Sequence, residues 1–111
     1  MRIDFEELPR TSNEHFKGGD GVTNIRAFND EINRIMKVTL ERGSSIGLHK
    51  HENNSEIVFI ISGKGKMITN GQAEELRAGM CSYCPMGSEH TLINIGEDEL
   101  ILFAVIPQHK Q

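Results

Sequence analysis

Three residues of types that commonly bind metals lie close together near the middle of the chain. His49 and His51 are two positions apart, and Glu56 follows five residues after His51. Side chains two positions apart on a strand point to the same face, so the two imidazoles would aim the same way. The polar residues 52–55 have the composition of a turn and would bring Glu56 to the start of the next strand, beside both rings. This arrangement predicts a metal site.

His90 is a fourth candidate ligand from a distant part of the chain. It begins a predicted strand directly after the tight turn of residues 85–89. Neutral imidazole and carboxylate suit divalent first-row metals. Three histidines and one glutamate would fill four positions of an octahedral ion and leave two open, whereas a structural zinc site is closed and tetrahedral. We therefore expect one divalent transition metal per chain, such as Mn, Fe, Ni or Zn.

Short strands separated by turns are predicted along most of the chain. Apolar and polar residues alternate, as in residues 35–41, and glycine, proline and asparagine interrupt the pattern. Asn70-Gly71 is the strongest hairpin signal, because both residues tolerate the positive φ angles of a type I′ turn. The predicted strands are residues 22–28, 35–41, 45–51, 56–62, 64–69, 72–77, 80–84, 90–95 and 100–106. Without an amphipathic helix longer than two turns, this pattern favours an antiparallel β-sandwich or barrel.

The length of the chain, 111 residues, suits one domain with a single core. We expect residues 1–21 to form an N-terminal arm or an edge strand, residues 22–107 the barrel domain, and residues 108–111 a polar tail. A strand within residues 1–8 would end at the proline that follows it. In the tail, His109 is expected to be solvated.

The composition argues against several classes of protein. A net charge of −4 with 25% charged residues offers no basic surface for nucleic acid. No apolar run reaches the roughly 18 residues that span a bilayer. The N-terminal segment is acidic and mixed in character, unlike a signal peptide. A cytoplasmic protein without membrane or nucleic-acid partners is therefore expected.

Cys81 and Cys84 have the Cys-x-x-Cys spacing of a redox pair, but the context is different. A redox pair usually opens a helix, whereas Cys84 precedes Pro85 in a strand-like run. Residues three apart on a strand face opposite sides, and a zinc site would need two further cysteines. We therefore expect two reduced structural thiols.

Two spaced patterns in this chain resemble the two sequence motifs of the cupin superfamily. The first reads Gly43-x5-His49-x-His51-x4-Glu56-x6-Gly63, and the second reads Gly79-x5-Pro85-x-Gly87-x2-His90-x3-Asn94. The resemblance implies an all-β double-stranded β-helix, or jelly roll, with a divalent metal inside the mouth of the barrel. It implies that His49, His51, Glu56 and His90 are the metal ligands. The whole chain is similar to the small single-domain cupins.

Two residues near these motifs have structural expectations. Gly47 lies on the metal-facing side of its predicted strand, and its missing side chain would leave room near the ion. Asn94 belongs to the second motif, and its expected role is a hydrogen bond at the end of a strand rather than catalysis.

The alternation along the predicted strands indicates a homodimer. If Glu56 points inward, Ile57, Phe59 and Ile61 point outward, and these outward residues are also apolar. Residues 100–106 are apolar on both faces as well. Because a barrel wall in a single layer should have one polar face, a second copy of the chain is expected to cover these residues.

Three functions are compatible with an open metal site. The resemblance to cupins favours a metal-dependent, dioxygenase-like enzyme with no catalytic residues beyond the metal ligands. The alternatives are a sugar or sugar-phosphate isomerase or epimerase, and a non-catalytic small-molecule-binding or sensor protein. The inward-facing positions contain no arginine for a phosphate, which favours a small neutral or aromatic ligand. These positions are Met36, Val38, Leu40, Val58, Ile60, Ser62 and Leu92.

Overall fold

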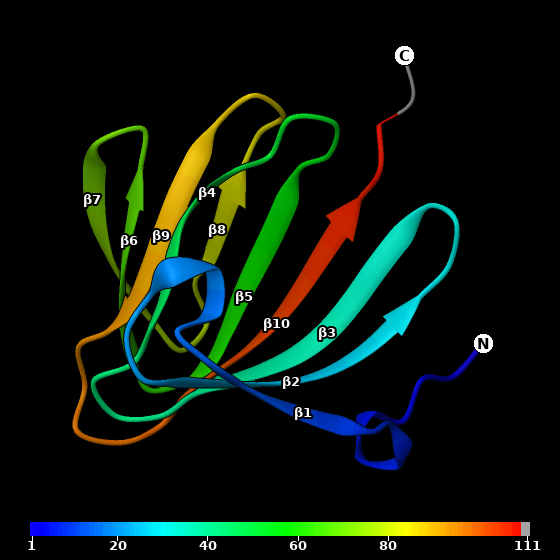
Figure 1. The fold of residues 1–111 in the computed structure, drawn as a ribbon, viewed down its shortest axis with the longest axis horizontal. Helices are drawn as coiled ribbons and strands as arrows, with labels where there is room; N and C mark the ends of the chain where they lie inside the picture. Colours follow the sequence, from blue (N-terminus) through cyan, green and yellow to red (C-terminus); the bar gives the residue numbers. More distant parts are fainter. Residues whose placement is uncertain (110–111) are drawn as a thin grey trace.

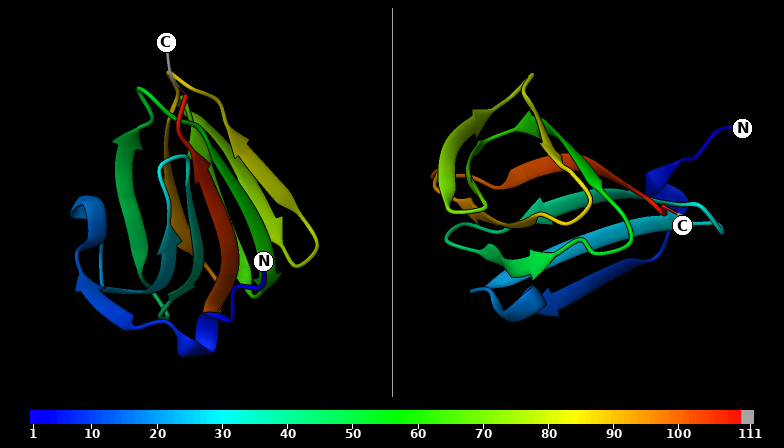
Figure 2. Two further views of the ribbon diagram at one scale, coloured as in Figure 1. Left: turned by 90° about the vertical axis from the view of Figure 1, so that its right-hand side faces the viewer. Right: turned by 90° about the horizontal axis from the view of Figure 1, so that it is seen from above.

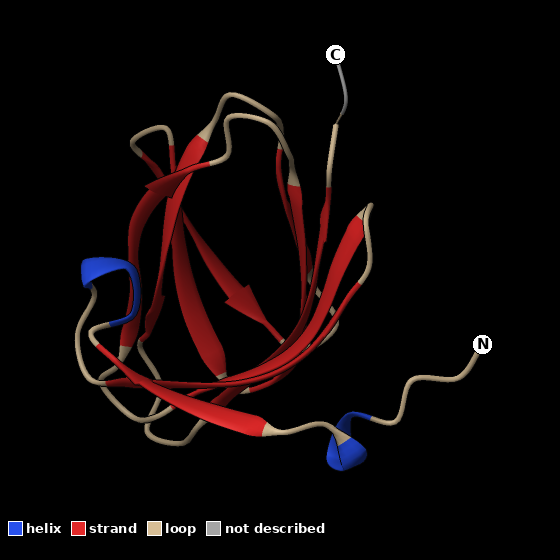
Figure 3. Cartoon of the chain, turned by 45° about the vertical axis from the view of Figure 1, so that its right-hand side comes forward, coloured by secondary structure: helices blue, strands red, loops and turns tan. Residues whose placement is uncertain are grey.

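The computed structural model describes residues 1–109, and most of them lie in β-strands (Figures 1 and 3). The strands are β1 (Arg10–Glu14), β2 (Val22–Asn29), β3 (Asn33–Leu40), β4 (Ser45–Lys50), β5 (Glu56–Ser62), β6 (Lys64–Thr69), β7 (Gln72–Arg77), β8 (Cys81–Cys84), β9 (Glu89–Asn94) and β10 (Leu100–Pro107). Two single turns of 3₁₀-helix, η1 (Phe5–Glu7) and η2 (Phe16–Gly18), flank β1. Within residues 1–109, no helix is long and apolar enough to cross a membrane.

The strands form two antiparallel sheets, which confirms the all-β jelly roll. The sheet orders are β1-β2-β3-β10-β5-β8 and β4-β9-β6-β7. β10, the last strand in the chain, lies between β3 and β5, so segments far apart in the sequence are hydrogen-bonded neighbours. Figure 2 shows both sheets curving around one interior.

The apolar core closes one end of this barrel. Leu40, Ile60 and Leu100 are fully buried, and Leu100 lies opposite Leu40 in the pairing of β10 with β3. Each such side chain contributes about 1.5–3 kcal/mol by leaving water. At the other end of the same strand pair, Ile106 lies opposite Arg34, and both residues line a cavity. The core therefore fixes the strands at one end and leaves the other end for a site.

Asn94 ties the strand ends together at the closed end. Its buried side-chain amide nitrogen donates to the carbonyl oxygens of Leu40, Glu41 and Asp98, at 3.1, 3.2 and 2.9 Å. Its amide oxygen accepts a hydrogen bond from the Gly96 backbone nitrogen at 3.0 Å. The predicted strand-end role of Asn94 is confirmed.

Asn94→Ala should lower the free energy of unfolding by about 2–3 kcal/mol, because it leaves several buried backbone groups without partners. Urea denaturation followed by circular dichroism measures this change. Asn53→Ala is the matched control, because the Asn53 side chain is exposed, and a change below about 0.5 kcal/mol is expected there. Equal losses in both variants would contradict the role assigned to Asn94.

The edge strand expected within residues 1–21 forms, but it does not lie within residues 1–8. No strand forms within residues 1–8; the Asp4 side chain instead accepts from the Glu6 nitrogen at 3.0 Å and caps η1. The Phe5 ring packs against Phe103, with 5.2 Å between ring centroids. The strand β1 follows Pro9 and forms the edge of the larger sheet beside β2. The aromatic contact with β10, which lies far away in the sequence, accompanies this conformation and is not visible in the local pattern.

The outer face of β5 and β8 is apolar and exposed. Ile57, Phe59 and Ile61 are 39%, 45% and 39% exposed, and Tyr83 on the neighbouring strand is 60% exposed. The predicted outward direction of the three β5 residues is thus confirmed.

The two cysteines are free thiols on opposite faces of β8, as predicted. Cys81 is exposed on the outer face, and Cys84 is buried. Burial, assisted by the negative charge of Glu56, raises the pKa of the Cys84 thiol to about 11. Cys84 therefore stays protonated and unreactive at neutral pH.

Candidate metal centre

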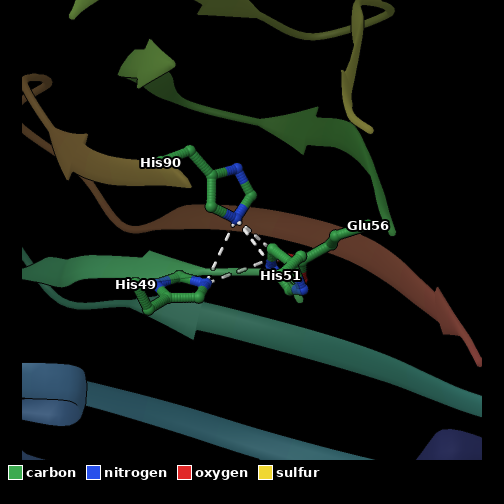
Figure 4. Close-up of side chains that lie close together, drawn as sticks. All are labelled: His49, His51, Glu56 and His90. Atoms are coloured by element: carbon green, nitrogen blue, oxygen red, sulfur yellow. Dashed lines mark hydrogen bonds and ion pairs between the residues drawn. The ribbon is translucent and has the colours of Figure 1, made fainter. Parts of the chain in front are cut away.

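The four predicted ligands converge at the open end of the barrel (Figure 4). His49 lies on β4, directly opposite His90 on β9. His51 follows the end of β4 by one residue, and Glu56 is the first residue of β5. One ligand atom from each residue lies within 4.8 Å of the others, so the cluster could hold a metal ion. The turn of residues 52–55 brings His51 and Glu56 together, as its composition predicts.

The distances between the ligand atoms suit one shared ion. The Nε2 atom of His90 is 3.1 Å from the Nε2 atoms of both His49 and His51. Oε1 of Glu56 is 2.8 Å from His90, 3.2 Å from His51 and 3.8 Å from His49. Two donor atoms that each lie about 2.1 Å from an ion, at a right angle, are about 3.0 Å apart. Most of these separations are close to that value.

Neighbouring groups fix which ring nitrogen of His49 and of His51 faces the centre. Nδ1 of His49 donates to the Gly47 carbonyl oxygen at 2.7 Å, and Nδ1 of His51 donates to Oδ1 of Asn54 at 2.6 Å. The proton of each neutral ring therefore sits on Nδ1, and the Nε2 lone pair points inward. Lone pairs and a carboxylate that face each other at about 3 Å repel unless a cation lies among them. The donor set therefore fits a divalent metal.

The titration behaviour of the cluster follows from its burial and its contacts. Burial alone would raise the pKa of Glu56, but a ring that also carries a proton on Nε2 donates it to the carboxylate instead of repelling it. Such hydrogen bonds from His49, His51 and His90 outweigh burial and hold the pKa of Glu56 well below its usual value. The hydrogen bond to Glu56 raises the pKa of His51, although burial and the positive charge of Lys17 oppose this shift. The carboxylate is thus ionised at neutral pH and available as an anionic ligand, while protons compete with a metal for the imidazoles.

The cluster forms part of the wall of a cavity of about 400 Å³. Apolar side chains make up much of the lining, among them Val38, Val58, Leu102 and Ile106. Arg34 also lines this cavity, so the prediction that no arginine faces inward is wrong. The error arises because β3 begins at Asn33, two residues earlier than predicted, which places Arg34 on the same face as Met36. A purely neutral ligand is therefore no longer favoured.

The expectation for Gly47 is also wrong. A Cβ atom there would collide with the Lys17 carbonyl oxygen and the Gly19 nitrogen, which belong to the segment around η2. The pairing of β4 with β9 shifts register between Ile46 and His49, so simple alternation fails at Gly47. Its missing side chain makes room for the η2 backbone, which brings Phe16 and Lys17 to the cavity.

The end of the described chain also contributes to the site region. Gln108 lines the cavity, and its backbone nitrogen donates to the Ile32 carbonyl oxygen at 2.6 Å. His109 is exposed, as expected, and its ring lies 2.8 Å from the Ser55 hydroxyl, next to Glu56. The remainder of the predicted polar tail, residues 110–111, lies outside the described residues.

The jelly roll and the histidine–glutamate cluster define a class of protein, and the comparison with known families agrees. Residues 36–106 match the family model of the cupin domain, so this chain belongs to the cupin family. It is 33% identical to an oxalate-binding protein of Thermotoga maritima, over 96% of this chain and 93% of that protein. A crystal structure from Thermotoga maritima, described as a predicted oxalate decarboxylase, matches with a TM-score of 0.91 and 29% identity, covering 97% of this chain and 99% of that one.

A larger relative matches over part of its length. Oxalate decarboxylase OxdC of Bacillus subtilis is 34% identical over 73 residues, which are 61% of this chain and 19% of that enzyme. The chain thus spans about one fifth of the decarboxylase.

His51→Ala and His90→Ala should each remove most of the bound metal, because each deletes one of four ligands, while the strands stay folded around the separate apolar core. Elemental analysis of protein purified without an affinity-tag nickel step measures the metal, and circular dichroism measures the fold. His15→Ala is the control, since this exposed histidine lies outside the cluster. Metal content that is unchanged in both ligand variants would show that the cluster is not the metal site.

Proposed function

We propose that this chain binds one divalent metal ion through His49, His51, Glu56 and His90 and uses the ion to bind a small chelating carboxylate. The observation that carries this proposal is the position of the four ligand atoms, which converge at the wall of a closed-ended cavity of about 400 Å³. The name of the Thermotoga maritima relative, an oxalate-binding protein, supports an acid of this kind.

The residues of this chain prepare the site for such a ligand. A divalent ion at the four ligands supplies positive charge and open positions for an anionic, chelating group. The Gly47 carbonyl and Asn54 hold two imidazoles in place, so little reorganisation accompanies binding. The apolar walls exclude water around the ligand and strengthen its electrostatic interactions.

The cavity favours binding over general acid–base catalysis. Besides the metal ligands, the titratable side chains that line it are Lys17, Arg34 and Lys50. All three are cationic at neutral pH and suit the binding of anions. Dioxygenase-like turnover at the open positions of the ion remains the second hypothesis, because it requires no base beyond the ligands. The sugar-phosphate alternative regains support from these cations.

Metal-loaded protein should bind oxalate at least about tenfold more tightly than acetate, because only the diacid can occupy two positions on one ion. Isothermal titration calorimetry measures both affinities, with His90→Ala as the variant expected to lose oxalate binding. Equal affinity for the two acids, or oxalate binding that survives in His90→Ala, would refute metal-mediated chelation. Oxygen uptake by the Fe(II) form with oxalate, diketones, catechols or thiols would support the dioxygenase-like hypothesis.

We also propose that a second copy of this chain covers the outer face of β5 and β8. The Phe5 ring of the same chain already packs on Phe103, but Phe59 and Tyr83 stay 45% and 60% exposed. A two-fold interface can cover this apolar face with the same face of another copy.

Light scattering during size exclusion should therefore give twice the chain mass of 12.5 kDa. Phe59→Glu should shift the mass to that of one chain, because it buries an unpaired charge in the interface. Ile95→Glu, at another exposed apolar residue, is the control and should leave the dimer intact. A single-chain mass for the unaltered protein would refute the homodimer.

A further inference from the structure

Three cationic side chains line the cavity without an acidic partner among residues 1–109, namely Arg34, Lys17 and Lys50. Within residues 1–109, the ion pairs of Lys and Arg involve Glu6 with Arg26 and Lys37, so neither Arg34 nor Lys17 forms one. Glu56 is the acidic residue of the lining, and it is already engaged by the three histidines. The positive charge in this part of the cavity is therefore available to an anion.

Two of these cations, Arg34 and Lys17, come from opposite walls. Arg34 is on β3 in the six-stranded sheet, whereas Lys17 is in η2, which packs on β4 of the four-stranded sheet. Figure 1 shows η2 in front of β4 and β9, across the barrel from the start of β3. Both side chains line the same cavity, so an anion inside it meets positive charge from two walls.

The Arg34 side chain is held in position rather than free in solvent. Its Nε lies 3.2 Å from the sulfur of Met36, and its Nη1 donates to Oδ1 of Asn29 at 3.0 Å. Its Nη2 has no hydrogen-bond acceptor among the described residues. An oriented guanidinium with an unused donor is well suited to a carboxylate or phosphate oxygen.

Lys17 is also placed by its backbone. Lys17 and His15 have φ angles of 55° and 52°, in the left-handed region that residues other than glycine rarely adopt. The close packing of Gly19 against Gly47 holds this segment on β4. Lys17 lines the same cavity as the metal cluster, and its Nζ lies over the Phe16 ring, 5.6 Å from the ring centroid.

The sheet pairing sets the separation of the two binding elements. Arg34 lies opposite Ile106 on β10, and Ile57 of β5 lies opposite Val105. Arg34 and Glu56 therefore lie on strands that flank β10, two strand spacings or about 10 Å apart. Between them the lining is apolar, including Ile106 and Leu102. This spacing of the backbones leaves room in the cavity for a ligand that extends beyond the metal ligands toward Arg34.

We infer that the ligand of this site carries a second anionic group, a carboxylate or a phosphate, bound by Arg34 and Lys17 while its chelating end is on the metal. This inference rests on the proposed function and extends it from oxalate to longer acids with a short apolar spacer. Arg34 and Lys17 select for the distal group, and the four metal ligands bind the chelating one.

A matched pair of ligands tests the distal group directly. 2-Oxoglutarate and 2-oxopentanoate have the same five-carbon chain and the same chelating 2-oxo acid end, but only the first has a terminal carboxylate. 3-Phosphoglycerate and glycerate form the corresponding pair for a terminal phosphate. In at least one pair, calorimetry with metal-loaded protein should show a roughly tenfold or greater preference for the member with the terminal anionic group. The pair with the larger preference identifies the distal anion.

Arg34→Met removes the charge and retains an unbranched side chain. It should reduce that preference to about threefold or less, while metal content and the affinity for the member without the terminal anionic group stay unchanged. Lys17→Met should reduce the preference in the same direction. Arg77→Met, at an exposed arginine outside the cavity, is the control and should retain the full preference.

The outcomes separate the two proposals. If 2-oxopentanoate or oxalate binds but neither 2-oxoglutarate nor 3-phosphoglycerate is preferred over its partner, the second anionic group is refuted and the metal-mediated function stands. Retention of the preference in Arg34→Met would also refute the distal site and leave the metal-mediated function standing. If none of these acids binds to the metal-loaded protein, the proposed function and the inference both fail.

Discussion

The mutual repulsion of hydrogen-bond acceptors is the constraint on which this structure depends. Three imidazole nitrogens and a carboxylate oxygen lie within 4.8 Å, and two of the rings are oriented so that their lone pairs point inward. Such an arrangement is unfavourable by itself, so the rest of the fold must hold it. The apolar core at the closed end and the network around Asn94 provide that rigidity at the opposite end of the same strands. Stability and chemistry are thus divided between the two ends of one barrel.

The parts that could be predicted from sequence depend on neighbouring residues. The boundaries of β5, β6 and β7 agree with the prediction because Gly63 and Asn70-Gly71, all at positive φ, fix where the chain turns. The four candidate ligands were found because strand periodicity and motif spacing both place them on the inner face. In each of these cases the relevant interactions span few residues, or repeat along a single strand.

The parts that could not be predicted depend on contacts between distant segments. Arg34 was missed because its strand begins earlier than the alternation showed, through pairing with both β2 and β10. The direction of Gly47 does not follow simple alternation, because a register shift reverses it. The segment it packs against, around η2, lies nearly thirty residues earlier. His109 contacts Ser55, which lies 54 residues earlier in the chain. No local pattern in the sequence carries this information, and Arg34 in particular changes the character of the cavity.

The contact between Gly19 and Gly47 has a consequence for variation in sequence. A side chain at either position would strike backbone atoms, namely the carbonyl oxygen of Ser45 in one case and that of Lys17 in the other. Because every residue carries these backbone atoms, no compensating substitution nearby can create the missing space. Chains that close the cavity in this way should therefore keep glycine at both positions, and this pair of glycines would distinguish them from barrels that share only the metal ligands.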